Sequence, residues 1–320
     1  MVNPSSPAYF WKHFLSLVIG ALCIAFAPIF VVLAGRIGGV GMMDAAFWRV
    51  AIGAVVLAFV VLPRGQAFPA GTRLGTWIWL PGVLFAADFA VWHASFAHTS
   101  VANSTLLANV SIVLVTLFAW WIWKEKIAPM FIVGAGIAGL GVVLLIFSSS
   151  TRGEVVPGGN PVLGDALGIA TAFFYASYLL STKAFRRVHS APRLMFWSSS
   201  LAAAILLPIA LWHGDPFWPS HQAGWWPLIA VGVISHAGGQ GLIAYSLAGL
   251  PATLAAITLL LQPVATALLG WMILGQGMVP WQMAGGTAVL IGLGIAVRFQ
   301  AGLNRHPPSS ESASISNTVP

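Results

Sequence analysis

The chain alternates long apolar runs with short polar turns. A transmembrane helix needs about 20 consecutive apolar residues, and runs of about that length recur ten times. The strands of a membrane β-barrel would alternate apolar and polar residues, which these runs do not, whereas a helix satisfies its own backbone hydrogen bonds inside a bilayer. We therefore expect an all-α membrane protein with ten transmembrane helices, at residues 14–34, 43–62, 75–97, 101–123, 129–147, 163–183, 193–212, 225–248, 251–274 and 280–299.

Composition supports a membrane protein and argues against a soluble one. Of the 320 residues, 58% are apolar and 7% are charged, against about 25% charged residues in a soluble domain. The net charge of +7 lies mainly in the turns, where it sets orientation in the bilayer, so nucleic acid is not an expected partner. The first run has 21 residues, longer than the roughly 7–15 of a signal-peptide core. We expect it to remain as the first span.

The two halves of the chain repeat each other at an offset of 151 residues. The matching pairs are Trp120 and Trp271, Pro129 and Pro280, Gly134 and Gly285, and Gly141 and Gly292, with Glu125 matching Gln276. A repeated set of hydrophobic helices is typical of transporters built from two related halves. We expect an N-terminal tail at residues 1–13, a first repeat at 14–147, a connector at 148–162, a second repeat at 163–299 and a disordered tail at 300–320.

The distribution of basic residues predicts the orientation. With a cytoplasmic N-terminus, eleven basic residues fall on the cytoplasmic side and two, Arg36 and Arg152, on the other. The eleven are Lys12, Arg64, Arg73, Lys124, Lys126, Lys183, Arg186, Arg187, Arg193, Arg298 and Arg305. Lys and Arg concentrate on the cytoplasmic side, so we expect a multi-pass protein of the inner (plasma) membrane with both termini inside. Five spans in each half are an odd number, so the two repeats must be inverted relative to each other.

Several short motifs resemble those of the EamA-type transporters of the drug/metabolite transporter superfamily. They are the Trp48-Arg49 pair, the run 100–104, the elbow from Trp120 to Pro129 with Glu125, the glycine-rich fifth span, and echoes around Pro251, Pro263 and Gly275. The resemblance covers roughly residues 14–299. It implies ten helices in two inverted repeats, a central cavity, and secondary transport of a small metabolite.

Two positions depart from the family pattern. Gln276 stands where the second elbow usually carries a glutamate, which removes a charge there. Ile112 stands where a proline is usual, although Pro263 keeps it in the second half. We therefore expect the fourth span to kink less than the ninth, and the two halves to move differently.

Asp88 is the acidic residue placed well inside a predicted span. A carboxylate at the middle of a membrane costs about 2.5–3.5 kcal/mol on insertion scales. Protonating it at pH 7 costs about 4 kcal/mol from an ordinary pKa near 3.9. Because the two costs are similar, Asp88 could exist in either form, as a proton-coupling group requires. The alternative is a structural polar contact to another helix.

Polar and aromatic side chains line one face of several spans. Trp92 and Ser95 share a helical face with Asp88, and Gln240 is its counterpart in the second half if the repeat slips by one residue. Such stripes also arise from hydrogen bonds between helices, worth about 0.6 kcal/mol on average, so each residue alone could be structural. Together they predict a substrate site near mid-membrane, formed by Asp88, Trp92, Tyr175, Tyr178, His236, Gln240, Tyr245 and Gln262.

The remaining candidates are assigned to structure. His93 and His98 are five residues apart and share no helix face, and with one cysteine, Cys23, the sequence holds no metal-ligand cluster. No phosphate-binding loop is present, so neither a cofactor nor ATP is expected. Arg49 and Glu125 are expected to make structural contacts, Glu125 in a solvated or interfacial salt bridge. We expect an exporter or exchanger, as a monomer or homodimer. The alternatives are a membrane-embedded enzyme, which would need paired catalytic groups, and a receptor or scaffold.

Overall fold

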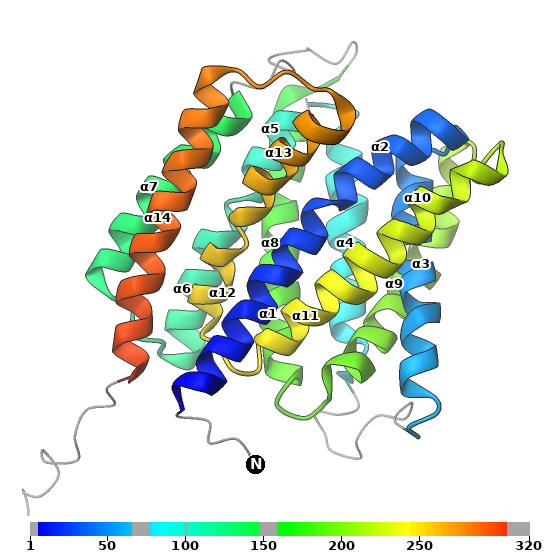
Figure 1. The fold of residues 1–320 in the computed structure, drawn as a ribbon. Helices are drawn as coiled ribbons and strands as arrows, with labels where there is room; N and C mark the ends of the chain where they lie inside the picture. The colour runs from blue at the N-terminus through cyan, green and yellow to red at the C-terminus, as the bar shows by residue number, and fades with distance from the viewer. Residues whose placement is uncertain (1–5, 66–76, 100, 148–158, 306–320) are drawn as a thin grey trace, which may run out of the picture.

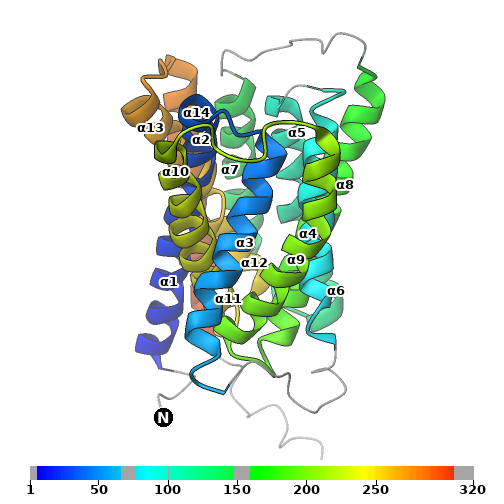
Figure 2. The same ribbon diagram turned by 90° about the vertical axis from the view of Figure 1, so that its right-hand side faces the viewer.

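The computed structural model describes residues 6–65, 77–99, 101–147 and 159–305, and all regular structure in these ranges is helical. The helices lie side by side in one bundle (Figures 1 and 2). In chain order they are α1 Pro7–Ala25, α2 Ala27–Gly38, α3 Met42–Val61, α4 Leu80–Ser95, α5 Val101–Ala108, α6 Ser111–Trp123, α7 Pro129–Phe147, α8 Pro161–Phe185, α9 Ala191–His213, η2 Gln222–Gly224, α10 Trp225–Ala230, η3 Val231–Gln240, α11 Gly241–Ser246, α12 Ala252–Thr258, α13 Leu261–Leu274 and α14 Pro280–Arg305.

The helices account for the expected spans. Within the described residues, nine stretches are long and apolar enough to cross a membrane, among them the joined pairs α1–α2, α5–α6 and α12–α13. The tenth, α4, has 16 residues, or about 24 Å at 1.5 Å per residue, and packs against α8 and α9 inside the bundle. The prediction of an all-α membrane protein with repeated halves is confirmed.

Three spans are interrupted near their middle. The first breaks at Phe26, the fourth at Asn109 and Val110, and the ninth at Leu259 and Leu260. The fourth span therefore breaks at the place equivalent to the break in the ninth, although Ile112 replaces the usual proline. The expectation of a straighter fourth span is not met. Asn109 donates its side-chain amide to the Thr105 carbonyl at 2.8 Å, and such local bonds compete with the helical backbone ladder.

Contacts between α7 and α14 show that the repeats are inverted. A Cβ atom on Gly134 would lie 2.6 Å from the Gly292 carbonyl oxygen, and one on Gly141 would lie 2.6 Å from that of Gly285. Rising numbers in α7 thus meet falling numbers in α14, so the two helices are antiparallel; Figure 1 shows them side by side. They are equivalent helices of the two repeats, and the contacts exchange equivalent partners, as a two-fold axis requires.

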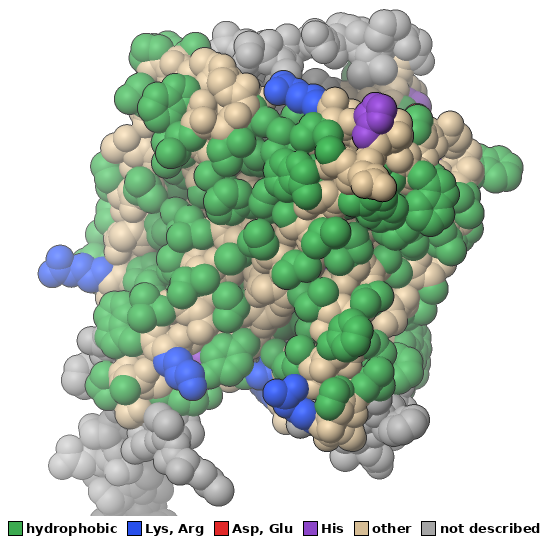
Figure 3. All heavy atoms as spheres, turned by 45° about the vertical axis from the view of Figure 1, so that its right-hand side comes forward, with side chains coloured by type: hydrophobic (Ala, Val, Ile, Leu, Met, Phe, Trp, Pro, Cys, Tyr) green, Lys and Arg blue, Asp and Glu red, His purple; other side chains and the backbone are tan. Residues whose placement is uncertain are grey.

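The flank of the bundle is apolar. Figure 3 shows hydrophobic side chains covering most of one side, with much of the Lys and Arg near its ends. Large apolar side chains such as Phe59, Leu140 and Met272 are strongly exposed, which suits contact with lipid. The start of α1 and the end of α14 lie at the same end of the bundle (Figure 1), as an even number of spans requires.

The described chain ends are more helical than expected. α1 begins at Pro7, inside the segment expected to be an N-terminal tail. α14 continues to Arg305, so residues 300–305 are helical although the sequence favoured a disordered tail from residue 300. The rest of that tail, residues 306–320, lies outside the described residues.

Candidate functional site

Side chains from α3, α4 and α8 form a charged cluster inside the bundle. Asp88 on α4 is 9% exposed. Arg49 on α3 lies within electrostatic reach of Asp88, Tyr175 and Tyr178. The structure thus brings together three residues predicted for the site. It adds Arg49, which the sequence assigned to a structural role because its position relative to Asp88 depends on how the helices of the bundle pack.

Aromatic rings surround these charges. The Arg49 guanidinium lies over the Phe89 ring, 5.2 Å from its centre. The centre of the Phe85 ring lies 4.6 Å from that of the Tyr178 ring and 5.6 Å from that of the His236 ring. Phe85, Asp88 and Phe89 share one face of α4 because residues three and four apart lie above one another on a helix. The low-polarity surroundings strengthen the electrostatic interaction between Arg49 and Asp88.

His236 belongs to a π-helical segment, η3, that packs against α3. Its Nε2 atom forms a 2.8 Å hydrogen bond with the Ser199 hydroxyl on α9. The imidazole lies where a Cβ atom of Gly53 would be, so α3 can approach η3 only with glycine at that position. π-helical turns are rare and occur often at functional sites. The sequence placed His236 and Gln240 on one helix face but did not predict this altered turn.

Several polar atoms around the cluster are buried and have no hydrogen-bond partner in the described structure. They are Arg49 Nε, Trp92 Nε1, His236 Nδ1, Gln240 Oε1 and Gln262 Nε2. Gln262 on α13 lies near the Tyr175 hydroxyl on α8. A buried polar group without a partner costs about 1–3 kcal/mol. Atoms of this kind are suited to bind the polar groups of a small molecule.

Tyr245 lies apart from this cluster. Its ring stacks on His13 at 4.7 Å, and the Lys12 ammonium lies 5.7 Å from the ring centre. Both partners come from the first turns of α1, at the end of the bundle where the chain begins (Figure 1). Tyr245 therefore does not join Asp88, although the sequence grouped the two.

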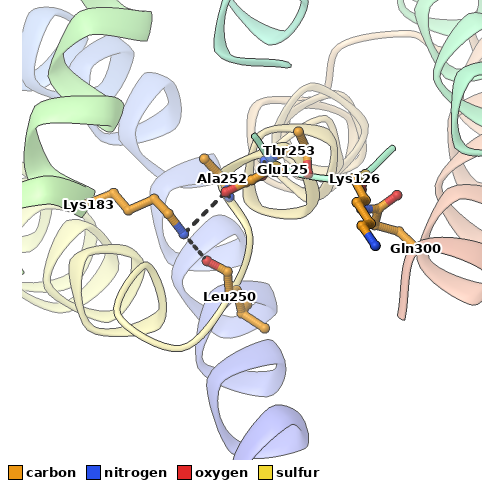
Figure 4. Close-up of polar contacts among 7 residues, drawn as sticks. All are labelled: Glu125, Lys126, Lys183, Leu250, Ala252, Thr253 and Gln300. Carbon is orange, nitrogen blue, oxygen red and sulfur yellow. Dashed lines mark hydrogen bonds and ion pairs between the residues drawn. The ribbon is translucent and has the colours of Figure 1, made fainter. Parts of the chain in front are cut away.

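Glu125 connects the two repeats, as the close-up in Figure 4 shows. Its carboxylate accepts hydrogen bonds from the Ala252 N–H at 2.8 Å, the Thr253 N–H at 3.2 Å and the Thr253 hydroxyl at 3.0 Å. The Lys183 ammonium lies 3.6 Å from the same carboxylate, and the two side chains are 13% and 12% exposed. A salt bridge is present, but it is nearly buried and its partner is Lys183, where a solvated or interfacial one was expected. The capping of α12 was not foreseen.

Gln300 fixes the other side of this elbow. Its carbonyl oxygen accepts from the Ala128 N–H at 3.1 Å, and its amide donates to the Lys126 carbonyl at 2.6 Å (Figure 4). Gln300 is 1% exposed. The sequence placed this residue in a tail, because a glutamine after the last apolar run carries no signal of a buried partner.

Two inverted helical repeats around a buried charged cluster define a class of membrane transporters. The EamA-like transporter family matches this chain twice, over residues 11–147 and 162–298. The chain belongs to that family, and the resemblance drawn from its motifs is confirmed.

Relatives are similar over much of their length. An uncharacterized transporter of Archaeoglobus fulgidus is 25% identical, over 88% of this chain and 95% of its own. The pseudopaline exporter CntI of Pseudomonas aeruginosa is 24% identical, over 78% of this chain and 83% of its own length. A solved structure described only as a crystal structure of a protein superposes with a TM-score of 0.76 at 17% identity, over 91% of this chain and 98% of that one; at that identity the likeness concerns the fold.

Proposed function

We propose that the protein is a secondary transporter that moves a small metabolite or drug-like compound across the inner (plasma) membrane by alternating access. The observation that carries this proposal is the buried pair of opposite charges, Arg49 and Asp88, among helices of both repeats. Transporters with inverted repeats bind their substrates near the midplane, at the repeat interface. Ionisable residues inside a membrane are costly and mark substrate or ion pathways.

We assign the substrate site to the cluster around these charges. Asp88 and Arg49 bind the polar groups of the substrate, and five further residues surround them: Trp92, Tyr175, Tyr178, His236 and Gln240. Gln262 adds a hydrogen-bond donor from α13, and Tyr245 contributes at the chain-end side of the pathway. The unpartnered donors and acceptors support this assignment, because each becomes satisfied only when it binds a polar group.

Asp88 also serves as the coupling group in this proposal. A carboxylate that binds either a proton or the substrate links the movement of the two in opposite directions. The named function of the pseudopaline exporter supports export as the direction. The repeats, residues 14–147 and 163–299, are the moving parts, and both termini are cytoplasmic, in a monomer or homodimer. Most of the connector 148–162 lies outside the described residues.

The experiment that tests the function is a flux assay with the purified protein in proteoliposomes. Vesicles are loaded with a metabolite extract, and efflux into buffers with and without a pH gradient is followed by mass spectrometry. We expect a small set of compounds to leave faster than from protein-free vesicles. Asp88→Asn should lose that flux, whereas Asp165→Asn, at the exposed start of α8, should keep it. Equal efflux from vesicles with and without the protein would overturn the proposal.

A further inference from the structure

We propose that Glu125 is a latch that holds the elbow end of the two repeats closed and must release α12 in every transport cycle. The elbow is the non-helical stretch 124–128 between α6 and α7. This inference rests on the proposed alternating access, and it assigns a mechanical role to a residue outside the substrate cluster.

The contacts of Glu125 suit a strong but reversible closure. The first N–H groups of a helix have no partner within the helix, and the positive end of the helix dipole attracts a carboxylate. Glu125 supplies that carboxylate to α12 from the other repeat, through the Ala252 and Thr253 N–H groups and the Thr253 hydroxyl. All of these bonds converge on one side chain, so they can form and break together.

Lys183 strengthens the latch from a third element. Its ammonium lies 3.6 Å from Glu125 and donates a hydrogen bond to the Leu250 carbonyl, just before α12 (Figure 4). It also lies 5.6 Å from the centre of the Trp123 ring, at the end of α6. The end of α8, the elbow and the start of α12 are thus joined at one point.

The helices tied by the latch are the halves of broken spans. α12 ends at the break before α13, and α6 begins after the break at Asn109 and Val110. α6 and α12 pack against each other. A break lets a half-helix tilt without moving the rest of its span. Release of Glu125 would therefore let these two half-helices separate while α5 and α13 keep their places.

Among the described residues, the opposite elbow shows no such arrangement. The repeat offset places Gln276 at the position equivalent to Glu125, and Val101 and Ala102 at those of Ala252 and Thr253. Gln276 is exposed, and its side-chain oxygen lies against Gly270 of its own span. An amide also lacks the charge that a helix N-terminus attracts. The closure is therefore asymmetric, and Glu125 biases the protein toward the state closed at its own elbow.

The latch can be tested by a distance across it. In a Cys23→Ser background, spin labels are attached at Lys126→Cys and Ala248→Cys, both at exposed positions on opposite sides of the latch. Distance distributions are recorded by pulsed electron spin resonance in nanodiscs without substrate. We expect one dominant short distance in the background protein. Glu125→Gln should increase the ratio of long to short distances about tenfold or more, the effect of losing one hydrogen-bonded charge.

Gln276 provides the matched control and a second test. Gln276→Ala should leave the distance distribution unchanged, because this side chain lies against Gly270 of its own span and does not join the two repeats. Gln276→Glu supplies the missing carboxylate at the opposite elbow, so it should raise the long-distance population at the Glu125 elbow. A purely structural role for Glu125 predicts no such response to a distant residue.

Two results would overturn the latch. One is an unchanged distribution in folded Glu125→Gln; the other is the same shift in Gln276→Ala. If Glu125 variants fail to fold, Gln276→Glu still tests the latch. An unchanged distance distribution in folded Gln276→Glu would contradict it. The labels report the opening without any solute, so a latch that opens in a protein that moves no compound would contradict the transport function and not the latch.

Discussion

The guanidinium of Arg49 lies over the ring of Phe89, 5.2 Å from its centre, and within electrostatic reach of the carboxylate of Asp88. The Nε atom of this guanidinium is buried and has no hydrogen-bond partner in the described structure. A planar guanidinium with a free edge binds carboxylates and other flat anions through two parallel hydrogen bonds. A side chain that the sequence assigned to a structural role thus supplies positive charge to the described cluster.

Arg49→Gln should weaken substrate binding about tenfold or more, since a hydrogen bond to a charged group contributes roughly 1.5–3 kcal/mol. Arg49→Lys should restore only part of the affinity, because an ammonium cannot form the paired bonds of a guanidinium. The concentration that half-saturates transport in proteoliposomes measures both effects. Arg298→Gln, at an exposed site on α14, is the control. Unchanged half-saturation in Arg49→Gln would return Arg49 to a structural role.

Asp88→Asn should abolish transport driven by a pH gradient while the protein remains folded, because asparagine resembles the protonated acid in shape but cannot release a proton. Exchange of substrate without a gradient should decline less. The two modes are compared in the same vesicles, with and without an imposed gradient. Gradient-driven flux by Asp88→Asn with the wild-type pH dependence would remove Asp88 from coupling.

Gly141→Ala should destabilise the bundle by about 1–3 kcal/mol, the usual cost of overpacking, because the added methyl group would meet the backbone of α14 at the Gly285 carbonyl. Gly139→Ala on the same helix is the matched control, since a Cβ there has open space around it. The midpoint of thermal unfolding in detergent distinguishes the two. Equal midpoints would show that α7 and α14 can separate slightly at no cost.

Gln300→Ala should destabilise the elbow by about 1–3 kcal/mol, because the buried Ala128 N–H and the Lys126 carbonyl lose their partner. Removal of residues 306–320, a polar and Ser-rich segment, should leave stability and transport unchanged. Thermal unfolding and flux are measured for both proteins. A truncated protein that inserts normally but does not transport would reveal a role for this segment.

Reporter fusions test the orientation predicted from the basic residues. An enzyme fused after Phe147 should be active outside the cytoplasm, and a fluorescent protein fused after Arg305 should be active inside. The asymmetry of eleven to two basic residues is the reason. An extracytoplasmic C-terminal fusion would contradict the model of ten spans.

The sequence by itself determined that the chain consists of membrane-spanning helices arranged in two related halves. The bilayer requires helices of a certain length with satisfied backbones, and both requirements act locally along the chain, so hydrophobicity alone reveals them. The glycines at an offset of 151 indicated two repeats, and the odd number of spans in each implied their inversion. Asp88 stood out because a single carboxylate inside a span is costly wherever its partner lies.

Tertiary structure decided which of these residues meet. Arg49 reaches Asp88, and Glu125 reaches Thr253, 128 positions later, because of how the helices rotate and tilt against one another. Tyr245 matches the site in residue type but faces the start of α1. Membrane helices are apolar on most of their faces, so hydrophobic pattern hardly specifies rotation. Close contacts such as Gly141 with Gly285 and Gly53 with His236 set it instead, and they form only when the bundle packs.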